Sequence, residues 1–396
     1  MSRVSARIGS IAPSATLAIT GKAAALRAAG EPVIGFGAGE PDFPTPEHVV
    51  EAAIRAAADP RMHKYTASAG LPALREAIAD LTGTRRGWTI DPSQVVVTNG
   101  GKQAVYMAFA ALCDPGDEVL LPGPYWVTYP EAIRLAGGVP VEVPTTDETD
   151  FKVDPALLDR YVTPRTKAIV FVSPSNPTGT VYRPDEVAAI ARWCLDRGIW
   201  VVADEIYEHL VYGDEVFTSI AATSPELRDT TILVNGVAKT YAMTGWRVGW
   251  LIGPPDVAIA VDNLQSHLTS NVANVSQMAA LAALTGPQDA VGHMLEAFDR
   301  RRRRTVEVLG GIDGVTCTEP GGAFYAFPNL TGTLGRPIGG RVASSSMDLA
   351  ELLLDVAKVA IVPGEAFGAP GYARLSYALG DDQLAEGLGR IVDALA

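Results

Sequence analysis

The sequence is poor in cysteine and histidine, and acidic residues outnumber basic ones. Its three cysteines, Cys113, Cys194 and Cys317, form no CxxC motif and no even set, which indicates free thiols in a reducing compartment, by default the cytoplasm. The five histidines show no HExxH or other paired spacing, so no metal site is expected. A net charge of −13 argues against a nucleic-acid partner, because phosphates would be repelled over most of the surface.

Long apolar runs are also missing. The N-terminus lacks the continuous apolar core of a signal peptide, and no run approaches the ~20 residues that a membrane span needs. The 396 residues are 47% hydrophobic and 19% charged, a composition typical of a globular α/β protein with room for two or three domains. We therefore expect a soluble protein that is large enough to enclose a buried site.

Short apolar runs alternate with longer helical patterns between residues 95 and 204. This alternation predicts βαβ units and a mostly parallel central sheet. Two long helical stretches are expected at residues 256–285 and 288–309, and short strands separated by helices follow. The predicted fold class is thus α/β, a large domain with a mostly parallel sheet plus a smaller α+β domain.

Unusual polar residues follow several of the predicted strands. Asn176, Asp204 and Lys239 each come after an apolar run, and the turn of Gly100 and Gly101 opens a helix. Ligands of open α/β sheets lie outside the carboxyl ends of the strands, so these residues are expected to converge on one ligand. A glycine pair before a helix lets an anion approach free backbone N–H groups, although such a pair is also an ordinary turn.

A lysine beside a buried acid and a phosphate-binding turn is what a Schiff-base cofactor requires. In this interpretation Asp204 keeps a pyridinium nitrogen protonated, because a carboxylate stabilises the charged form, and Tyr207 holds the phenolic oxygen of the ring. The alternatives are a helix-capping role for Asp204 and a surface position or ion pair for Lys239. Glu205 is assigned no role.

Nine motifs, distributed over nearly the whole chain, carry a family likeness. They are AGEPDFPTP (38–46), KYTASAGLPALREAIA (64–79), TNGGKQA (98–104), PYWVTYPE (124–131), SPSNPTG (173–179), ADEIYEHL (203–210), AKTYAMTGWRVGW (238–250), GGAFY (321–325) and RLSYA (374–378). With these motifs the chain resembles class I pyridoxal-phosphate aminotransferases, most closely bacterial aspartate aminotransferases. The resemblance implies the fold type I of that family, with an N-terminal arm and part of the small domain in residues 1–45, the large cofactor domain in 46–292 and the small domain in 293–396.

The resemblance also implies roles around the cofactor, pyridoxal 5′-phosphate. Lys239 carries it as a Schiff base and moves the proton of the reaction, while Asp204 pairs with the ring nitrogen. Asn176 and Tyr207 bond the phenolic oxygen, and Trp126 lies on the ring face.

A phosphate cradle is implied as well. Its members are Gly100, Gly101, Lys102 and Arg247, joined by Tyr65 from the partner subunit of a homodimer with shared active sites.

For the substrate, the resemblance implies that Arg374 clamps the α-carboxylate opposite the backbone of Gly39. Lys102, with the hydroxyls of Ser14 and Thr16, would bind a side-chain carboxylate. Together with Trp126 and Asn176, these complete the expected substrate site.

Three departures from relatives refine this expectation. The stretch 248–299, in which the animal-type branch carries an arginine for acidic substrates, contains no lysine or arginine. Gly236 replaces a serine that contacts phosphate in many relatives. Ala12 and Pro13 stand where prephenate-accepting relatives carry a lysine, which disfavours that substrate without excluding it.

The sequence therefore predicts a ping-pong transaminase of amino-acid metabolism that converts L-aspartate and 2-oxoglutarate to oxaloacetate and L-glutamate. The alternatives are an aminotransferase for aromatic amino acids, prephenate or other donors, and a cofactor-dependent lyase of the same fold. A ligand-sensing module is disfavoured because no DNA-binding helical domain is attached.

Overall fold

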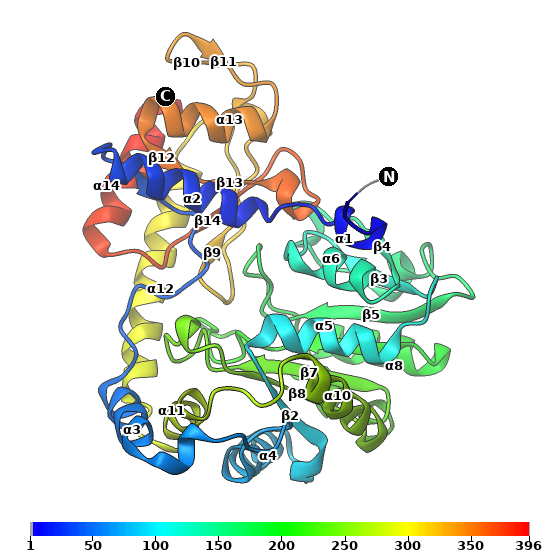
Figure 1. The fold of residues 1–396 in the computed structure, drawn as a ribbon. Coiled ribbons are helices and arrows are strands. Elements are labelled where there is room, and N and C mark those ends of the chain that lie inside the picture. Colours follow the sequence, from blue (N-terminus) through cyan, green and yellow to red (C-terminus); the bar gives the residue numbers. More distant parts are fainter. Residues whose placement is uncertain (1–2, 396) are drawn as a thin grey trace.

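The computed structural model describes residues 3–395 and places two groups of elements at opposite ends of the molecule (Figure 1). One group is built on a seven-stranded sheet and the other on several short sheets. The long helix α12 (Asp289–Gly310) runs from one group to the other. Among these residues, no helix combines the length and apolar character needed to cross a membrane.

The large sheet confirms the predicted parallel arrangement. From edge to edge its strands are β2 (Val95–Thr98), β8 (Gly249–Ile252), β7 (Thr231–Gly236), β6 (Trp200–Asp204), β5 (Thr166–Val172), β3 (Glu118–Pro122) and β4 (Val139–Val143). Only β8 runs antiparallel to its neighbours. In the register, Val172, Asp204 and Val234 lie side by side, so the segments that follow these three strands emerge at one edge of the sheet.

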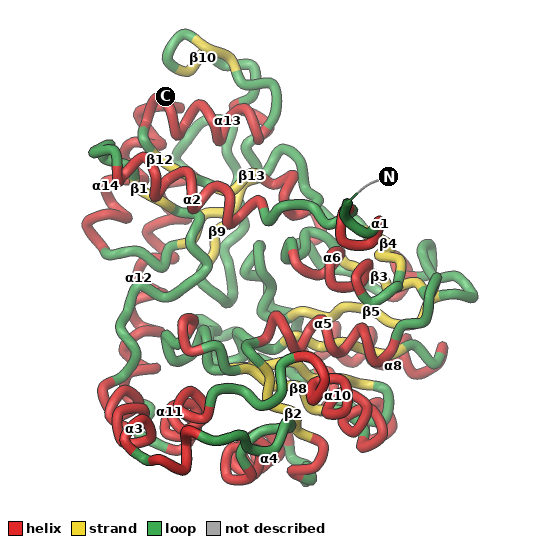
Figure 2. The backbone as a smooth tube through the Cα atoms, in the orientation of Figure 1, coloured by secondary structure: helices red, strands yellow, loops and turns green. Residues whose placement is uncertain are grey.

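Helices cover both faces of this sheet (Figure 2). Successive strand residues such as Val201 and Val202 point to opposite faces and join different apolar clusters, as the period of two requires. One face packs against α3 (Glu47–Ala58), α4 (Pro72–Arg86), α8 (Pro184–Arg197) and α11 (Asn274–Thr285). The other packs against α5 (Gly101–Leu112), α6 (Thr128–Leu135) and α10 (Pro255–Leu268).

The helix expected over 256–285 is wrong as one continuous element, because the chain breaks between α10 and α11. Ser270 adopts a left-handed backbone conformation, with φ of 57°, that ends the first helix. The side chain of Asn274 then donates hydrogen bonds to the backbone carbonyls of Met62 (3.1 Å) and Lys64 (2.8 Å). These contacts tie the start of α11 to the segment that follows α3, which a helical period alone does not reveal.

The smaller group joins the two ends of the chain. Its strands are β1 (Ile34–Gly35), paired with β12 (Val359–Ala360), the sheet of β13 (Val362–Pro363), β14 (Ala373–Ser376) and β9 (Tyr325–Ala326), and the hairpin of β10 (Pro337–Ile338) and β11 (Arg341–Val342). Its helices are α2 (Ala15–Ala28), α13 (Ser346–Leu352) and α14 (Asp381–Leu395). Three further α-helices are short: α1 (Ala6–Gly9), α7 (Pro155–Leu158) and α9 (Pro225–Arg228).

Candidate active site

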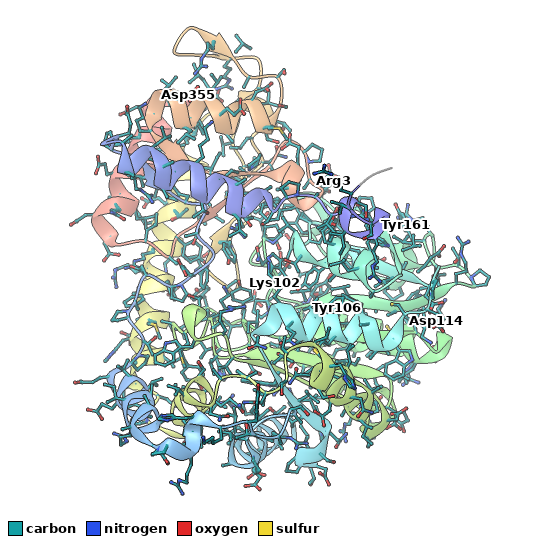
Figure 3. All side chains as sticks on the ribbon, in the orientation of Figure 1. Arg3, Lys102, Tyr106, Asp114, Tyr161 and Asp355 are labelled. Atoms are coloured by element: carbon teal, nitrogen blue, oxygen red, sulfur yellow. The ribbon has the colours of Figure 1, made fainter. Side chains whose placement is uncertain are left out.

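A cavity of about 320 Å³ is lined by both groups of elements at the edge where β5, β6 and β7 end. The predicted site residues that line it are Thr16, Gly39, Gly101, Lys102, Trp126, Asn176, Asp204, Tyr207, Lys239, Arg247 and Arg374. Figure 3 shows Lys102 in the first turn of α5, on the side that faces the smaller group. Segments far apart in the sequence thus meet at one site.

The carboxylate of Asp204 ends β6 and is only 5% exposed. Its Oδ1 accepts a hydrogen bond from the backbone N–H of Ile206 (3.1 Å), and its Oδ2 accepts one from the hydroxyl of Tyr129 (2.8 Å). Burial raises the pKa of Asp204, whereas these two bonds and the charge of Lys239 oppose the rise. A charged carboxylate at this position is therefore best stabilised by a cation in the cavity.

Lys239 follows β7 and donates a hydrogen bond through Nζ to the backbone carbonyl of Gly39. Desolvation, followed by repulsion from Arg374, lowers the pKa of Lys239 to about 8. A lysine with this pKa is partly the free amine at neutral pH, the form that attacks carbonyl groups and accepts protons.

Arg374 lies on β14 and is 2% exposed. Its Nη1 donates to Oδ1 of Asn176 (2.9 Å) and its Nη2 to the carbonyl of Gly37 (2.9 Å), while Nε has no partner. Burial lowers the pKa of Arg374, and no carboxylate among residues 3–395 opposes this effect. A buried guanidinium held by neutral groups is suited to bind a carboxylate that enters the cavity.

The glycine turn lies against Arg247. Gly100 has a φ of 80°, and a Cβ there would stand 2.6 Å from Nη2 of Arg247. Helix α5 begins at Gly101 without a side-chain cap, which leaves its first N–H groups free for an anion. Lys102 places its Nζ 5.1 Å from the ring centroid of Trp126, and desolvation, followed by the charge of Arg247, lowers the pKa of Lys102.

Three expected residues do not line this cavity: Tyr65, Ser14 and Gly100, which precedes the lining residue Gly101. The side chain of Tyr65 is 91% exposed and does not line it. Ser14 caps the N-terminus of α2, and its Oγ shares a hydrogen bond (3.0 Å) with Oγ1 of Thr16. Ser14 lines a neighbouring cavity together with Lys102.

Two tyrosines were missed in the sequence. Tyr129 bonds Asp204 and packs edge-on against Trp126, with ring centroids 5.4 Å apart. Trp126 lies before α6 and Tyr129 lies in its first turn, so helix periodicity gave no signal for this pair. Tyr325 shares a hydrogen bond (2.9 Å) with the hydroxyl of Tyr207.

Glu40 and Thr244 also line the cavity without having been predicted. Oγ1 of Thr244 donates to Oε2 of Glu40 (2.8 Å), and this bond connects the segment after β1 to the loop before β8.

Comparisons with known proteins find relatives that match over nearly the whole chain. An aspartate aminotransferase of Streptomyces avermitilis is 59% identical over 100% of this chain and 97% of its own length. A probable aspartate/prephenate aminotransferase of Aquifex aeolicus is 49% identical, covering 99% of this chain and 98% of its own. The solved structure of the aspartate aminotransferase from Thermus thermophilus with maleate superposes with a TM-score of 0.93 at 42% identity and covers 100% of both chains.

The sequence model described as "Aminotransferase class I and II" matches residues 31–391. The match spans the cavity-lining segments from Gly37 to Arg374. The chain therefore belongs to the class I and II aminotransferase family.

Proposed function

We propose that this protein is a pyridoxal-phosphate-dependent aminotransferase that transfers the amino group of L-aspartate to 2-oxoglutarate by a ping-pong mechanism. One observation carries the proposal. The cavity joins Lys239, whose pKa is lowered to about 8, to the buried carboxylate of Asp204 and to Arg374, a buried cation with no acidic partner among residues 3–395. These are the groups needed to bind a carbonyl cofactor and an amino acid together.

The residues present fit pyridoxal phosphate. The uncapped start of α5 at Gly101, with Gly100, Lys102 and Arg247, offers N–H groups and positive charge to a phosphate. The residues that would surround the ring are Trp126 on its face, Asp204 at its nitrogen, Asn176 and Tyr207 at its phenolic oxygen, and Lys239 at its aldehyde. When bound, the cofactor supplies the electron sink for the reaction at Cα of the amino acid.

The side chains of the chain itself then divide the work. Lys239 accepts a proton at Nζ and returns it, which a pKa near neutrality favours in both directions. Asp204, whose charged form is favoured by the hydrogen bond from Tyr129, stabilises positive charge at the floor of the site. Trp126 excludes water from one face of the cavity.

The substrate's two carboxylates have separate binding groups in this proposal. Arg374 binds the α-carboxylate through its free Nε and its Nη groups, next to the backbone of Gly39. Lys102 binds the side-chain carboxylate with the hydroxyls of Thr16 and Ser14. The Thermus thermophilus relative was solved with maleate, itself a dicarboxylate, which supports this division.

A second amino donor has one specific observation in its favour, since several relatives are named aspartate/prephenate aminotransferases. Against it, the lysine expected for prephenate is replaced by Ala12 and Pro13, which line the neighbouring cavity together with Lys102. We therefore place aspartate first and treat prephenate and aromatic donors as alternatives. A lyase would release a keto acid without an amino acceptor, so the stoichiometry of the products distinguishes a lyase from an aminotransferase.

We also propose a homodimer with shared active sites and a cytoplasmic location. The exposed ring of Tyr65 supports the first, because a large aromatic that faces solvent in one chain has a role once a second chain covers it. The free thiols of Cys113, Cys194 and Cys317 are in keeping with a reducing compartment.

The test is a visible absorption spectrum of the purified protein with pyridoxal phosphate, recorded alone, after L-aspartate and after 2-oxoglutarate. The bound cofactor should give a visible band that bleaches with aspartate and returns with the keto acid. The Lys239→Ala variant should keep its fold, as judged by thermal unfolding, and lose turnover. A band that ignores aspartate would overturn the donor, and the absence of any band would overturn the proposal.

A further inference from the structure

Tyr325 occupies a central place in the cavity wall, and no step described above uses it. It lies on β9, is 1% exposed, and pairs in register with Ser376 of β14, the strand that carries Arg374. Its ring and its hydroxyl group contact different partners.

The ring of Tyr325 supports Arg374. The guanidinium carbon lies 4.5 Å from the centroid of Tyr325 and 5.1 Å from that of Phe367. Asn176 and Gly37 hold the two Nη atoms, and Nε stays free. An aromatic face that fixes a desolvated guanidinium gives the cation an orientation that neutral hydrogen-bond partners alone do not set.

The hydroxyl of Tyr325 lies 2.9 Å from that of Tyr207, and both side chains are buried. A phenol that accepts one hydrogen bond becomes a better donor in the next. If Tyr325 donates to Tyr207, the proton of Tyr207 is left for an oxygen atom in the cavity.

We infer that Tyr325 is a positioning residue that links the two halves of the site, its ring orienting Arg374 toward the substrate carboxylate and its hydroxyl directing Tyr207 toward the cofactor. The inference rests on the proposed function and deepens it. The charged groups that face this tyrosine pair are Arg374, Asp204 and Glu40, and Lys239 lies beside them on Gly39.

Two variants separate the roles. Tyr325→Phe keeps the ring and removes the hydroxyl, whereas Tyr325→Leu removes both. The test measures succinate binding to the cofactor-loaded protein by calorimetry, and the pH midpoint of the visible band. Tyr325→Leu should bind succinate roughly tenfold more weakly or worse, while Tyr325→Phe binds it within about twofold of the wild type.

The pH midpoint of the visible band reports the effect of the Tyr325 hydroxyl on Tyr207. Without Tyr325 as a partner, Tyr207 is a weaker hydrogen-bond donor, so negative charge on the phenolic oxygen of the cofactor would be less stabilised. The bound cofactor would then hold its proton more tightly. Tyr325→Phe should therefore raise the midpoint by roughly half a pH unit. Tyr377→Phe is the control, because this buried tyrosine belongs to the same apolar cluster, bonds the carbonyl of Ala323 (3.4 Å) and does not line the cavity.

The outcomes distinguish this inference from the proposed function. If the wild type binds cofactor and succinate, but both Tyr325 variants bind and titrate as it does, the inference is wrong and the function stands. If Tyr325→Leu fails to fold, an unchanged midpoint in Tyr325→Phe still refutes the hydroxyl role. A wild type that binds neither ligand overturns both.

Discussion

Lys239 lies among other cations of the cavity, so its protonation is coupled to folding. Its pKa is about 8 in the folded chain against an ordinary value of 10.5. Between these values the unfolded chain binds more protons, so this group makes the free energy of unfolding rise with pH. Below about pH 8 Lys239 is protonated in both the folded and the unfolded chain, so the desolvated ammonium lowers the free energy of unfolding by its full cost.

This sign gives a prediction for the cofactor-free protein. Lys239→Met should increase the free energy of unfolding at pH 7 by on the order of 1–3 kcal/mol. The gain should shrink as the pH rises from about 8 toward 10.5, because the wild-type amine then loses its charge. Denaturant unfolding at both ends of the range measures the difference, with the exposed Lys22→Met as control. A difference that does not change with pH would contradict the prediction.

The residues that sequence reasoning found and missed differ in a physical way. Asn176, Asp204 and Lys239 follow apolar strands, and parallel strands bring such positions together whatever the details of packing. Tyr129 and Tyr325 instead act through hydroxyl contacts with Asp204 and Tyr207 that exist only once distant segments have packed. The roles assigned to all these residues stay predictions, whereas their placement around one cavity is observed.

Among the elements, β8 lies against the start of α5 with no room for a side chain. A Cβ on Gly249 would stand 2.4 Å from the backbone nitrogen of Gly101 and 2.6 Å from the carbonyl carbon of Gly100. Gly236, on the neighbouring strand β7, is equally confined, with a Cβ there 2.9 Å from Cα of Gly249. A serine at Gly236 would therefore meet the backbone of β8, which gives a packing reason for the glycine at this position.

Gly249→Ala should lower the free energy of unfolding by at least about 1–3 kcal/mol, because backbone atoms must move apart. It should also weaken pyridoxal phosphate binding, since the displaced atoms belong to the proposed phosphate turn. Gly389→Ala is the matched control: this glycine is exposed in α14 with nothing near its Cβ, and alanine there should stabilise by ~0.5–1 kcal/mol. Calorimetric unfolding and cofactor titration measure both, and equal effects of the two changes would refute the argument.

Element type and order were predictable where the periodicity was unambiguous, as for the parallel sheet and α12. The break between α10 and α11 was not predictable, because the hydrogen bonds that the side chain of Asn274 donates are to Met62 and Lys64, more than two hundred positions away in the sequence. Glu205 likewise found its partner only in the fold, where it forms a buried ion pair with Arg86 of α4. A sequence-adjacent pair of acids thus divides into one that faces the cavity and one that fastens a helix.

At the scale of the whole molecule, the exposed Tyr65 decides whether one chain forms a complete active site or needs a second chain. Tyr65 is 91% exposed and lies outside the cavity, so a chain acting alone offers it no role in cofactor binding. In the proposed homodimer this tyrosine reaches the phosphate of the other subunit. A monomer and a homodimer with shared active sites therefore predict opposite effects of substituting Tyr65 on cofactor binding.

Tyr65→Ala should leave the stability of the chain within about 0.5 kcal/mol, as surface changes do, and weaken pyridoxal phosphate binding several-fold. Val216→Ala, another exposed hydrophobic change at 59% exposure, should alter neither quantity. Cofactor titration by absorbance, with the mass in solution from light scattering, makes the comparison. If the protein is a dimer and Tyr65→Ala binds the cofactor as tightly as the wild type, the homodimer stands but the shared active site is refuted. If the protein is a monomer that binds the cofactor with wild-type affinity, both the homodimer and the shared site are refuted, because no second chain is present to supply the phenol.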